Sequence, residues 1–191
     1  MKTTHLQSSS IKTMLQQLQA NFGGTLLKDL KEYTLEIDNT IGKGKIKGMS
    51  LKGGISYLEF DMVFFHNLML SINIEDKNPI YFTYCSKGSL SHSFGEDEEK
   101  RTLESYQTAI LTCNKNNEHV LYFTENEQLQ ATLITVQTAS RDSIPDSDSL
   151  KEKLRQTFYS PNNSENYVYI GSNNLQIAEK IEQLNAISQK G

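Results

Sequence analysis

The chain of 191 residues carries 19 lysines and arginines against 23 aspartates and glutamates, which gives a net charge of −4. This length suits one large domain with a small appendage and is enough to bury a core without disulfides. The acidic balance excludes the sequence-independent attraction to phosphate on which nucleic-acid-binding surfaces depend. No apolar run approaches the ~20 residues of a membrane-spanning helix. The polar start MKTTHLQSSS lacks the apolar stretch of a secretory signal, so we expect a cytoplasmic protein with no membrane partner.

The N-terminal region predicts one short amphipathic helix. Its apolar residues recur at helical spacing: Ile11, Met14, Leu15, Leu18 and Phe22. Serines at positions 8 to 10 are natural caps for the free N–H groups of such a start, and Gly23-Gly24 supply the stop. We expect the apolar face to pack on the body of the protein. The residues before the helix, including His5, are expected to form a loose terminus.

From Tyr33 to Thr138 the hydrophobic period changes to two, which is typical of β-strands. The segments richest in β-branched and aromatic residues are Tyr33–Ile37, Gly54–Phe60, Leu68–Ile74, Ile80–Cys85, Thr108–Leu111, Val120–Phe123 and Leu129–Val136. Short strands separated by turn residues predict antiparallel pairing into a sandwich or barrel. The segment IGKGKIKG does not fit a dinucleotide loop, because its third glycine comes one place late and no helix follows. It predicts a strand with Lys43, Lys45 and Lys47 on the wet face and glycines at bends.

Helical spacing returns after Pro145. Ser149 and Glu152 fit a capping box ahead of a first helix, and Asn173 and Gln176 fit a second. The second helix carries an apolar stripe made of Leu175, Ala178, Ile181 and Leu184. We expect this stripe to form a homodimer interface, because an apolar helix face that its own domain leaves uncovered seeks a partner. The alternative, that the stripe packs on its own barrel, stays open.

Residues with catalytic or metal-binding chemistry form no recognisable motif. The four histidines, His5, His66, His92 and His119, show no metal-ligand spacing. Cys85 and Cys113 have no basic sequence neighbour that would lower a thiol pKa, and are expected to be reduced core thiols. The acidic run from Glu96 to Glu99 is expected to be a solvated hairpin tip. We therefore expect no catalytic residue, no metal, no cofactor and no enzymatic activity.

Aromatic residues gather in several of the predicted strands, with Tyr81, Phe82 and Tyr84 in one of them. Because side chains alternate along a strand, about half of the aromatic rings face the interior. An aromatic interior with a few polar tips is suited to one small ligand. The residues expected to bind it are Tyr57, Tyr84, His92 and Gln107. A packed core without any cavity is the alternative.

The glycines and apolar positions of these strands follow a longer pattern. It runs through Gly42-x-Gly44-x-Ile46-x-Gly48, Gly54-Ile55-Ser56-x-Leu58-x-Phe60-Asp61, Pro79-Ile80-x-Phe82-x-Tyr84-Cys85-x-x-Gly88-x-Leu90-x-His92-Ser93-Phe94, Gln107-x-Ala109-Ile110 and Tyr169-x-Gly171-Ser172. This pattern resembles the N-terminal regulatory domain of bacterial AraC-type (AraC/XylS) transcriptional regulators. The resemblance covers the chain from about Tyr33 to its end.

The resemblance implies a mainly β fold with flanking helices. Residues 1–140 would form the N-terminal helix and a cupin-like antiparallel β-barrel or jelly roll that senses a small effector, such as a sugar or metabolite. Residues 141–191 would form a helical hairpin that links and homodimerises. DNA would be bound only through a helix-turn-helix domain expected downstream of Gly191. A freestanding small-molecule-binding cupin module and, less favoured, a cupin enzyme are the alternatives.

Overall fold

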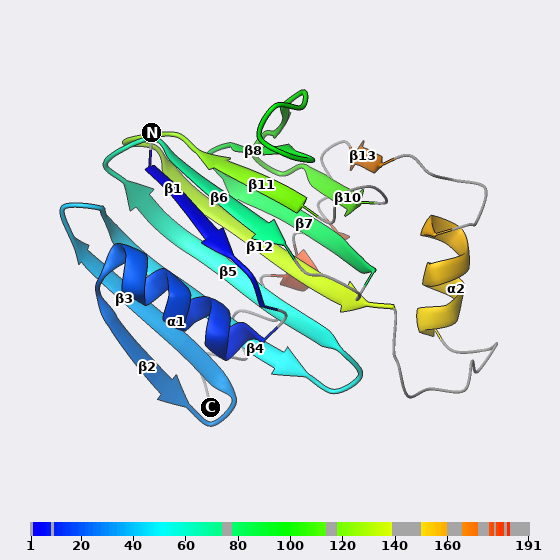
Figure 1. Cartoon of the computed structure of the whole chain (residues 1–191), viewed down its shortest axis with the longest axis horizontal. Helices are drawn as coiled ribbons and strands as arrows, with labels where there is room; N and C mark the ends of the chain where they lie inside the picture. The colour runs from blue at the N-terminus through cyan, green and yellow to red at the C-terminus, as the bar shows by residue number, and fades with distance from the viewer. Residues whose placement is uncertain are drawn as a thin grey trace.

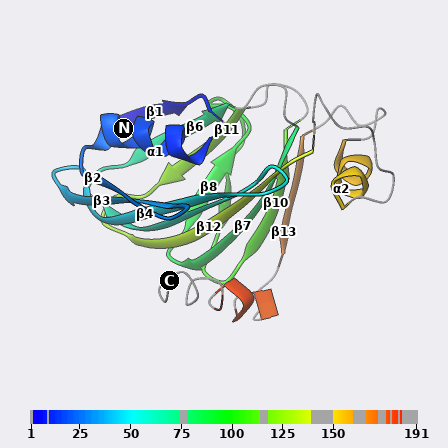
Figure 2. The same ribbon diagram turned by 90° about the horizontal axis from the view of Figure 1, so that it is seen from below.

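Two β-sheets face each other in the computed structural model of the chain, and helix α1 lies in the layer of the smaller sheet (Figures 1 and 2). The structure describes residues 2–8, 10–73, 78–113, 118–138, 150–159 and 166–171, together with 176, 177, 179–181 and 183. In this part of the chain the larger sheet has eight strands, in the order β13-β10-β7-β12-β5-β4-β3-β2, and the smaller has five, in the order β1-β6-β11-β8-β9.

The strands of the larger sheet are β2 (Thr25–Asp29), β3 (Glu32–Asn39), β4 (Gly42–Leu51), β5 (Ile55–Phe64), β7 (Pro79–Lys87), β10 (Thr108–Thr112), β12 (Gln128–Gln137) and β13 (Tyr167–Gly171). Those of the smaller sheet are β1 (Lys2–Leu6), β6 (Leu68–Asn73), β8 (Leu90–Ser93), β9 (Arg101–Leu103) and β11 (Glu118–Phe123). The helices are α1 (Ile11–Phe22) and α2 (Leu150–Phe158). None of the helices in this described part is long and apolar enough to cross a membrane.

The eight strands β5 to β12 form a jelly roll. The order β10-β7-β12-β5 in one sheet faces the order β6-β11-β8-β9 in the other, and every neighbouring pair among these eight strands is antiparallel. This arrangement is the double-sheet solution in which two Greek keys share one core, and cupins are among the proteins built on it. The mainly β, jelly-roll part of the sequence prediction is therefore confirmed.

The core between the sheets is closed at one end by α1. Its apolar face is buried, as predicted, and the ring of Phe22 lies edge-on to Phe64 with centroids 5.9 Å apart. Phe64 and Phe60 in turn contact Phe123 of the opposite sheet. Gly48 on β4 permits this closure, because a Cβ there would lie 2.5 Å from the side chain of Ile11. The glycine therefore lets the helix approach the sheet closely.

The N-terminal residues differ from the sequence prediction in two ways. Lys2–Leu6 is not a loose terminus, because it pairs in parallel with β6 and buries Thr4 and Leu6. Parallel pairing between segments so far apart leaves no local sequence signal. The serine cap is also wrong in detail, since Ser10 occupies the N-cap position without a side-chain capping hydrogen bond. Its carbonyl oxygen accepts the N–H of Met14 instead.

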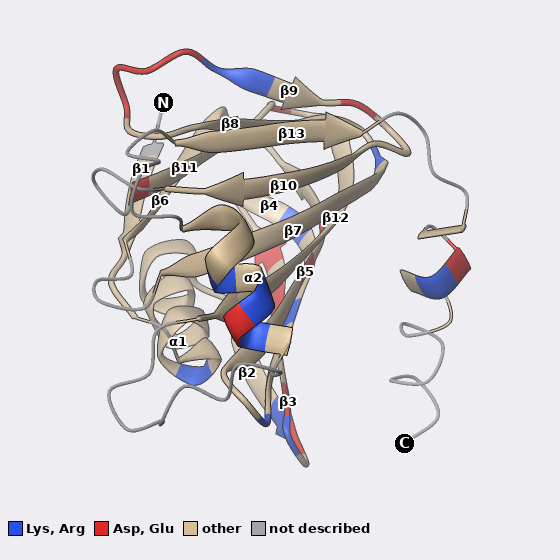
Figure 3. Cartoon of the chain, turned by 90° about the vertical axis from the view of Figure 1, so that its right-hand side faces the viewer, with Lys and Arg blue, Asp and Glu red and all other residues tan. Residues whose placement is uncertain are grey.

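Strand β4 has the predicted alternation. Lys43, Lys45 and Lys47 all lie on the outer face, where Lys43 is exposed and pairs with Asp38 at 3.4 Å. The Lys47 side chain is only 13% exposed and pairs with Glu32 at 3.7 Å, so the predicted wet face is largely covered at this position. The acidic run between β8 and β9 is the solvated hairpin tip that was predicted, and Figure 3 shows it in red directly before the blue start of β9.

The C-terminal region contains more than helices. Helix α2 is present, and the described residues between 176 and 183 are helical, but β13 lies between these two stretches and extends the larger sheet. The predicted helical hairpin is therefore interrupted by a strand. Ser149, Asn173, Leu175, Ala178 and Leu184, on which the predicted caps and stripe also depend, lie outside the described residues.

Candidate ligand-binding groove

An apolar groove of about 1120 Å³ lies on the outer face of the larger sheet. Its floor is made by β7, β10, β12 and β13, and its walls by α2 and the helical residues near the C-terminus. Figure 2 shows these helical residues beneath β7 and β10, on the side of the sheet opposite α1. The principal apolar lining residues are Phe82, Tyr84, Ile110, Ile134, Val136, Leu154, Tyr169 and Ile181.

The register of the strands explains why the floor is apolar. Phe82 lies directly opposite Ile110 on one side and Ile134 on the other. The row continues to Tyr169 of β13 beyond Ile110, and to Tyr57 of β5 beyond Ile134. Aromatic and β-branched side chains thus stand side by side across five strands on one face, where neighbouring pairs stabilise each other.

The next row along the same face carries polar groups. Tyr84 lies opposite Thr108 and Thr132, and Thr132 lies opposite Glu59. The Tyr57 hydroxyl donates a hydrogen bond of 3.2 Å to Glu59 Oε2. Burial raises the pKa of the Glu59 carboxyl above its ordinary value, although the hydrogen bond from Tyr57 opposes this shift. Of this row, Tyr84 and Thr108 line the groove and give its apolar floor a polar margin, whereas Thr132 and Glu59 continue the row beyond the groove.

The groove leaves apolar side chains of both its wall and its floor open to solvent. In the wall Leu150 is 68% exposed and Ile177 39%, and in the floor Tyr169 is 54% exposed. Helix α2 has no buried residue. Tyr159, the residue that follows the helix, connects it to the barrel, because its hydroxyl donates a hydrogen bond of 2.7 Å to the Pro79 carbonyl oxygen. Gln176, Glu179 and Lys180 add polar groups to the same wall. A molecule with an apolar body and a polar end fits this lining, because such sites join a mainly apolar surface to a few placed polar groups.

A second cluster of polar groups lies between the sheets, where His92 of β8 and His119 of β11 are buried. His92 Nε2 and His119 Nδ1 are 3.1 Å apart, so one ring donates its proton and the other accepts. The rings of Tyr81 and Phe94 pack against His119. Within the described residues, His92 Nδ1, His119 Nε2 and the Tyr81 hydroxyl have no hydrogen-bond partner. Burial lowers the pKa of His92 to about 3 and that of His119 well below its ordinary value, so both rings are neutral.

The four residues predicted to bind a ligand do not converge on one point. Tyr84 lines the outer groove, and Tyr57 lies on the same face, beyond Ile134. His92 points between the sheets, on the other side of the barrel wall. Gln107 lies just before β10. Its side-chain oxygen accepts a hydrogen bond of 2.8 Å from the Glu104 N–H and so stabilises the turn between these two residues.

Ile181, one of the four residues of the predicted dimer interface, is buried and packs against Tyr84 of its own barrel. Cys85 and Cys113 are free and buried, and burial raises the pKa of Cys85 to about 11. The raised pKa makes the Cys85 thiol a poor nucleophile.

Sequence reasoning missed Ile110, Ile134 and Tyr169 as lining residues. The sequences of β7 and β12 contained a signal, because their apolar residues occupy consecutive positions instead of alternating ones. In the structure, successive residues of both strands are buried accordingly. Strands covered on both faces have such continuous patterns, whereas β5, whose outer face is only half-buried, alternates strictly.

Comparison with known proteins gives only distant likenesses. No family model matches the chain, and no curated protein matches it. A regulator of the HTH_3 family from Vibrio cholerae has a similar structure, with a TM-score of 0.40 and 15% identity over 66% of this chain and 64% of that one. The cupin domain of an XRE-family transcriptional regulator from Enterobacter cloacae gives a TM-score of 0.35 and 12% identity over 43% of this chain and 80% of that one. Oxalate decarboxylase from Bacillus subtilis gives 0.36 and 10%, over 76% of this chain and 43% of that one. The jelly-roll assignment stands on the strand order and register described above.

Proposed function

We propose that this chain is the effector-sensing domain of a transcriptional regulator of the AraC type, and that its effector is a small amphipathic molecule bound in the outer groove. The observation that carries the proposal is the composition of the groove, whose floor belongs to the barrel and whose wall includes Ile177, Lys180 and Ile181 near the C-terminus. A ligand in the groove contacts both parts at once.

The proposed mechanism is a shift between two positions of the C-terminal helical residues. A ligand that contacts Lys180 and Ile177 together with Phe82 binds more tightly when those residues are docked on the sheet. The difference in affinity between the docked and undocked states sets how far binding moves the equilibrium. DNA-binding units attached beyond residue 191 would receive that change, and a homodimer would present two of them. Because Ile181 packs within its own chain, the dimer contact in this proposal uses other residues of the region.

The groove is tested with the amphipathic fluorophore 8-anilinonaphthalene-1-sulfonate. We expect the folded wild-type protein to bind it at one site, and Ile110→Trp to weaken binding at least tenfold, because the larger ring fills the centre of the floor. The protein has no tryptophan, so the single indole that this substitution introduces also reports directly on the environment of the groove.

The matched control is Leu27→Trp, at a half-exposed position on β2 at the far end of the same sheet. This control should bind the probe as the wild type does, with both variants keeping the wild-type circular dichroism. Equal binding by Ile110→Trp and the wild type would contradict the groove as the ligand site.

The regulator part of the proposal is tested separately, by reading the gene beyond the codon for Gly191. Two helix-turn-helix units in the same reading frame would support it. A stop codon at that point, with binding to the groove intact, would favour the freestanding binding module instead.

A further inference from the structure

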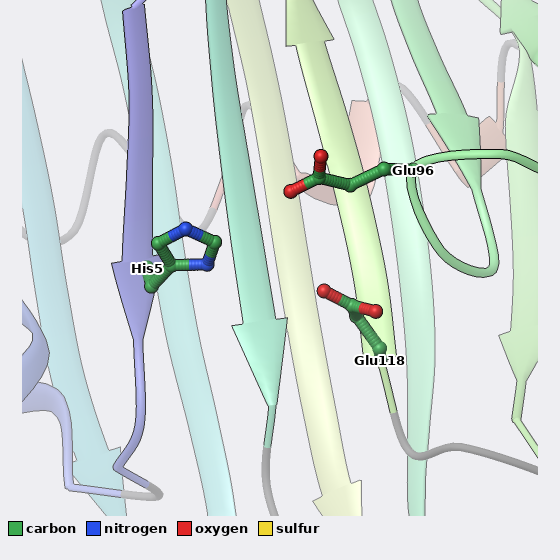
Figure 4. A group of neighbouring side chains, drawn as sticks. All are labelled: His5, Glu96 and Glu118. Atoms are coloured by element: carbon green, nitrogen blue, oxygen red, sulfur yellow. The ribbon is translucent and has the colours of Figure 1, made fainter.

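Three side chains with metal-binding chemistry meet on the outer face of the smaller sheet, on the opposite side of the molecule from the groove. They are His5 of β1, Glu96 in the hairpin between β8 and β9, and Glu118 at the start of β11. Each offers one ligand atom, and the three atoms all lie within 4.8 Å of one another. Figure 4 shows the imidazole and the two carboxylates pointing toward a common centre.

The fold itself brings these residues together. His5 pairs with Ser71 of β6, and Ser71 pairs with Val120 of β11, so His5 and Glu118 lie on the same face of the sheet. The buried Ser71 hydroxyl donates a hydrogen bond of 2.7 Å to Glu118 Oε1, which fixes one carboxylate oxygen and leaves the other available. Hydrogen bonds of this kind, behind the ligand, orient the donors of metal sites.

The hairpin that carries Glu96 is also anchored beside the site. The hydroxyls of Ser93 and Tyr122, both buried, are hydrogen-bonded at 3.0 Å, and the Ser93 hydroxyl also donates to the Gly95 carbonyl oxygen. The ammonium group of Lys100 lies 3.9 Å from the centre of the Tyr122 ring. Both ends of the hairpin tip are therefore held against β11, and Glu96 is presented to the other two donors.

The charges at this point are unbalanced. Among the ion pairs between described residues, none includes Glu96 or Glu118, whereas their neighbour Glu99 pairs with Arg101. Two carboxylates close together repel each other unless a cation lies between them. Ligand atoms about 2 Å from one ion are separated by roughly 3 to 4 Å, which small rotations of the exposed His5 and Glu96 side chains toward the half-buried Glu118 would reach.

From this geometry we infer that His5, Glu96 and Glu118 bind one divalent transition-metal ion of the Zn²⁺ type, with water in the remaining positions. Mixed imidazole and carboxylate donors favour such ions over Mg²⁺ and Ca²⁺, which prefer all-oxygen sites. The ion would join the N-terminal strand to the hairpin and to β11. Because it binds the folded state only, it would stabilise the attachment of β1.

The test uses the untagged full chain, freed of metal with a chelator and titrated calorimetrically with ZnCl₂. We expect one equivalent of Zn²⁺ to bind, with a rise in Tm, and MgCl₂ to bind at least tenfold more weakly. His5→Gln and Glu118→Gln should each weaken Zn²⁺ binding at least tenfold. Glu98→Gln, an exposed carboxylate of the same hairpin outside the trio, is the matched control and should bind as the wild type does.

Two results would overturn the inference. One is the absence of stoichiometric Zn²⁺ binding by the wild type, which would leave the three side chains as surface neighbours that bind no ion. The other is undiminished binding by His5→Gln and Glu118→Gln, which would place the ion elsewhere. Fluorophore binding in the groove should be unchanged in every one of these variants, so the two sites are tested independently.

Discussion

Acidification from pH 7 to pH 4.5 is expected to destabilise the protein steeply, because His92 and His119 are neutral in the folded barrel. Burial lowers the pKa of both, to about 3 for His92, with the charge of Arg101 adding to the effect. In the unfolded chain both histidines titrate near their ordinary value of 6.5. Below that pH the unfolded state binds more protons than the folded state, so the free energy of unfolding falls as the pH falls.

The size of this effect follows from the pKa shift of each histidine. Below roughly pH 6, each histidine lowers the free energy of unfolding by up to about 1.4 kcal/mol per pH unit, and the two together lower it by up to about 2.7 kcal/mol per unit. Domains of this kind have roughly 5–15 kcal/mol of stability in total. Urea unfolding at a series of pH values measures the slope.

The double variant His92→Leu/His119→Leu removes both titrating groups and their unpaired nitrogens, and should flatten the pH dependence. His66→Leu, at an exposed position, is the control and should keep the wild-type slope. If the double variant loses stability with acid as steeply as the wild type, the buried pair does not cause the acid sensitivity.

Gly44→Ala is expected to cost at least about 3 kcal/mol of stability, which is large for the addition of one methyl group. Gly44 has φ of +137°, a conformation that side chains strongly disfavour. A Cβ at this position would also clash with the carbonyl oxygen of Asp61 and lie 3.0 Å from Met62 Cα. Both neighbours are backbone atoms of β5, so relief would require β4 and β5 to separate locally.

Lys43→Ala, one position earlier on β4, is the matched control. Its side chain is 70% exposed and pairs only at the surface, so the change in stability should stay within about 0.5 kcal/mol. Chemical denaturation of the two variants gives the comparison. A Gly44→Ala protein as stable as Lys43→Ala would show that β4 can adopt another backbone conformation at this point.

The sequence predicts those parts of the fold that depend on local patterns. Helix α1 begins and ends where its apolar spacing and the glycines at 23 and 24 place it, and the alternation in β4 and β5 is correct. These elements are recognisable because one face is buried and the other is more exposed, so that their apolar residues recur with a regular period. Strands β1 and β13 were not predicted, because each is defined by its pairing with a distant strand.

The two candidate sites depend on the same long-range pairing. Phe82, Ile110 and Ile134 become neighbours only through the register of three strands, and Tyr84 was expected inside the barrel because an aromatic residue gives no sign of which face of a doubly covered strand it occupies. The trio of His5, Glu96 and Glu118 spans more than half of the chain and has no sequence spacing to detect. A search for local motifs therefore finds neither site.

The parallel pairing of β1 with β6 has a consequence for amide hydrogen exchange. The N–H groups of β6 point alternately toward β1 and toward β11, because successive residues of a strand face opposite neighbours. Detaching the five-residue β1 exposes only the first set, and an edge segment of this length opens at lower free energy than the jelly roll as a whole. Along Leu68–Asn73, every second amide should therefore exchange with deuterium faster than its neighbours. The exchange rates of these alternate amides would then report the free energy of detaching β1 from the sheet.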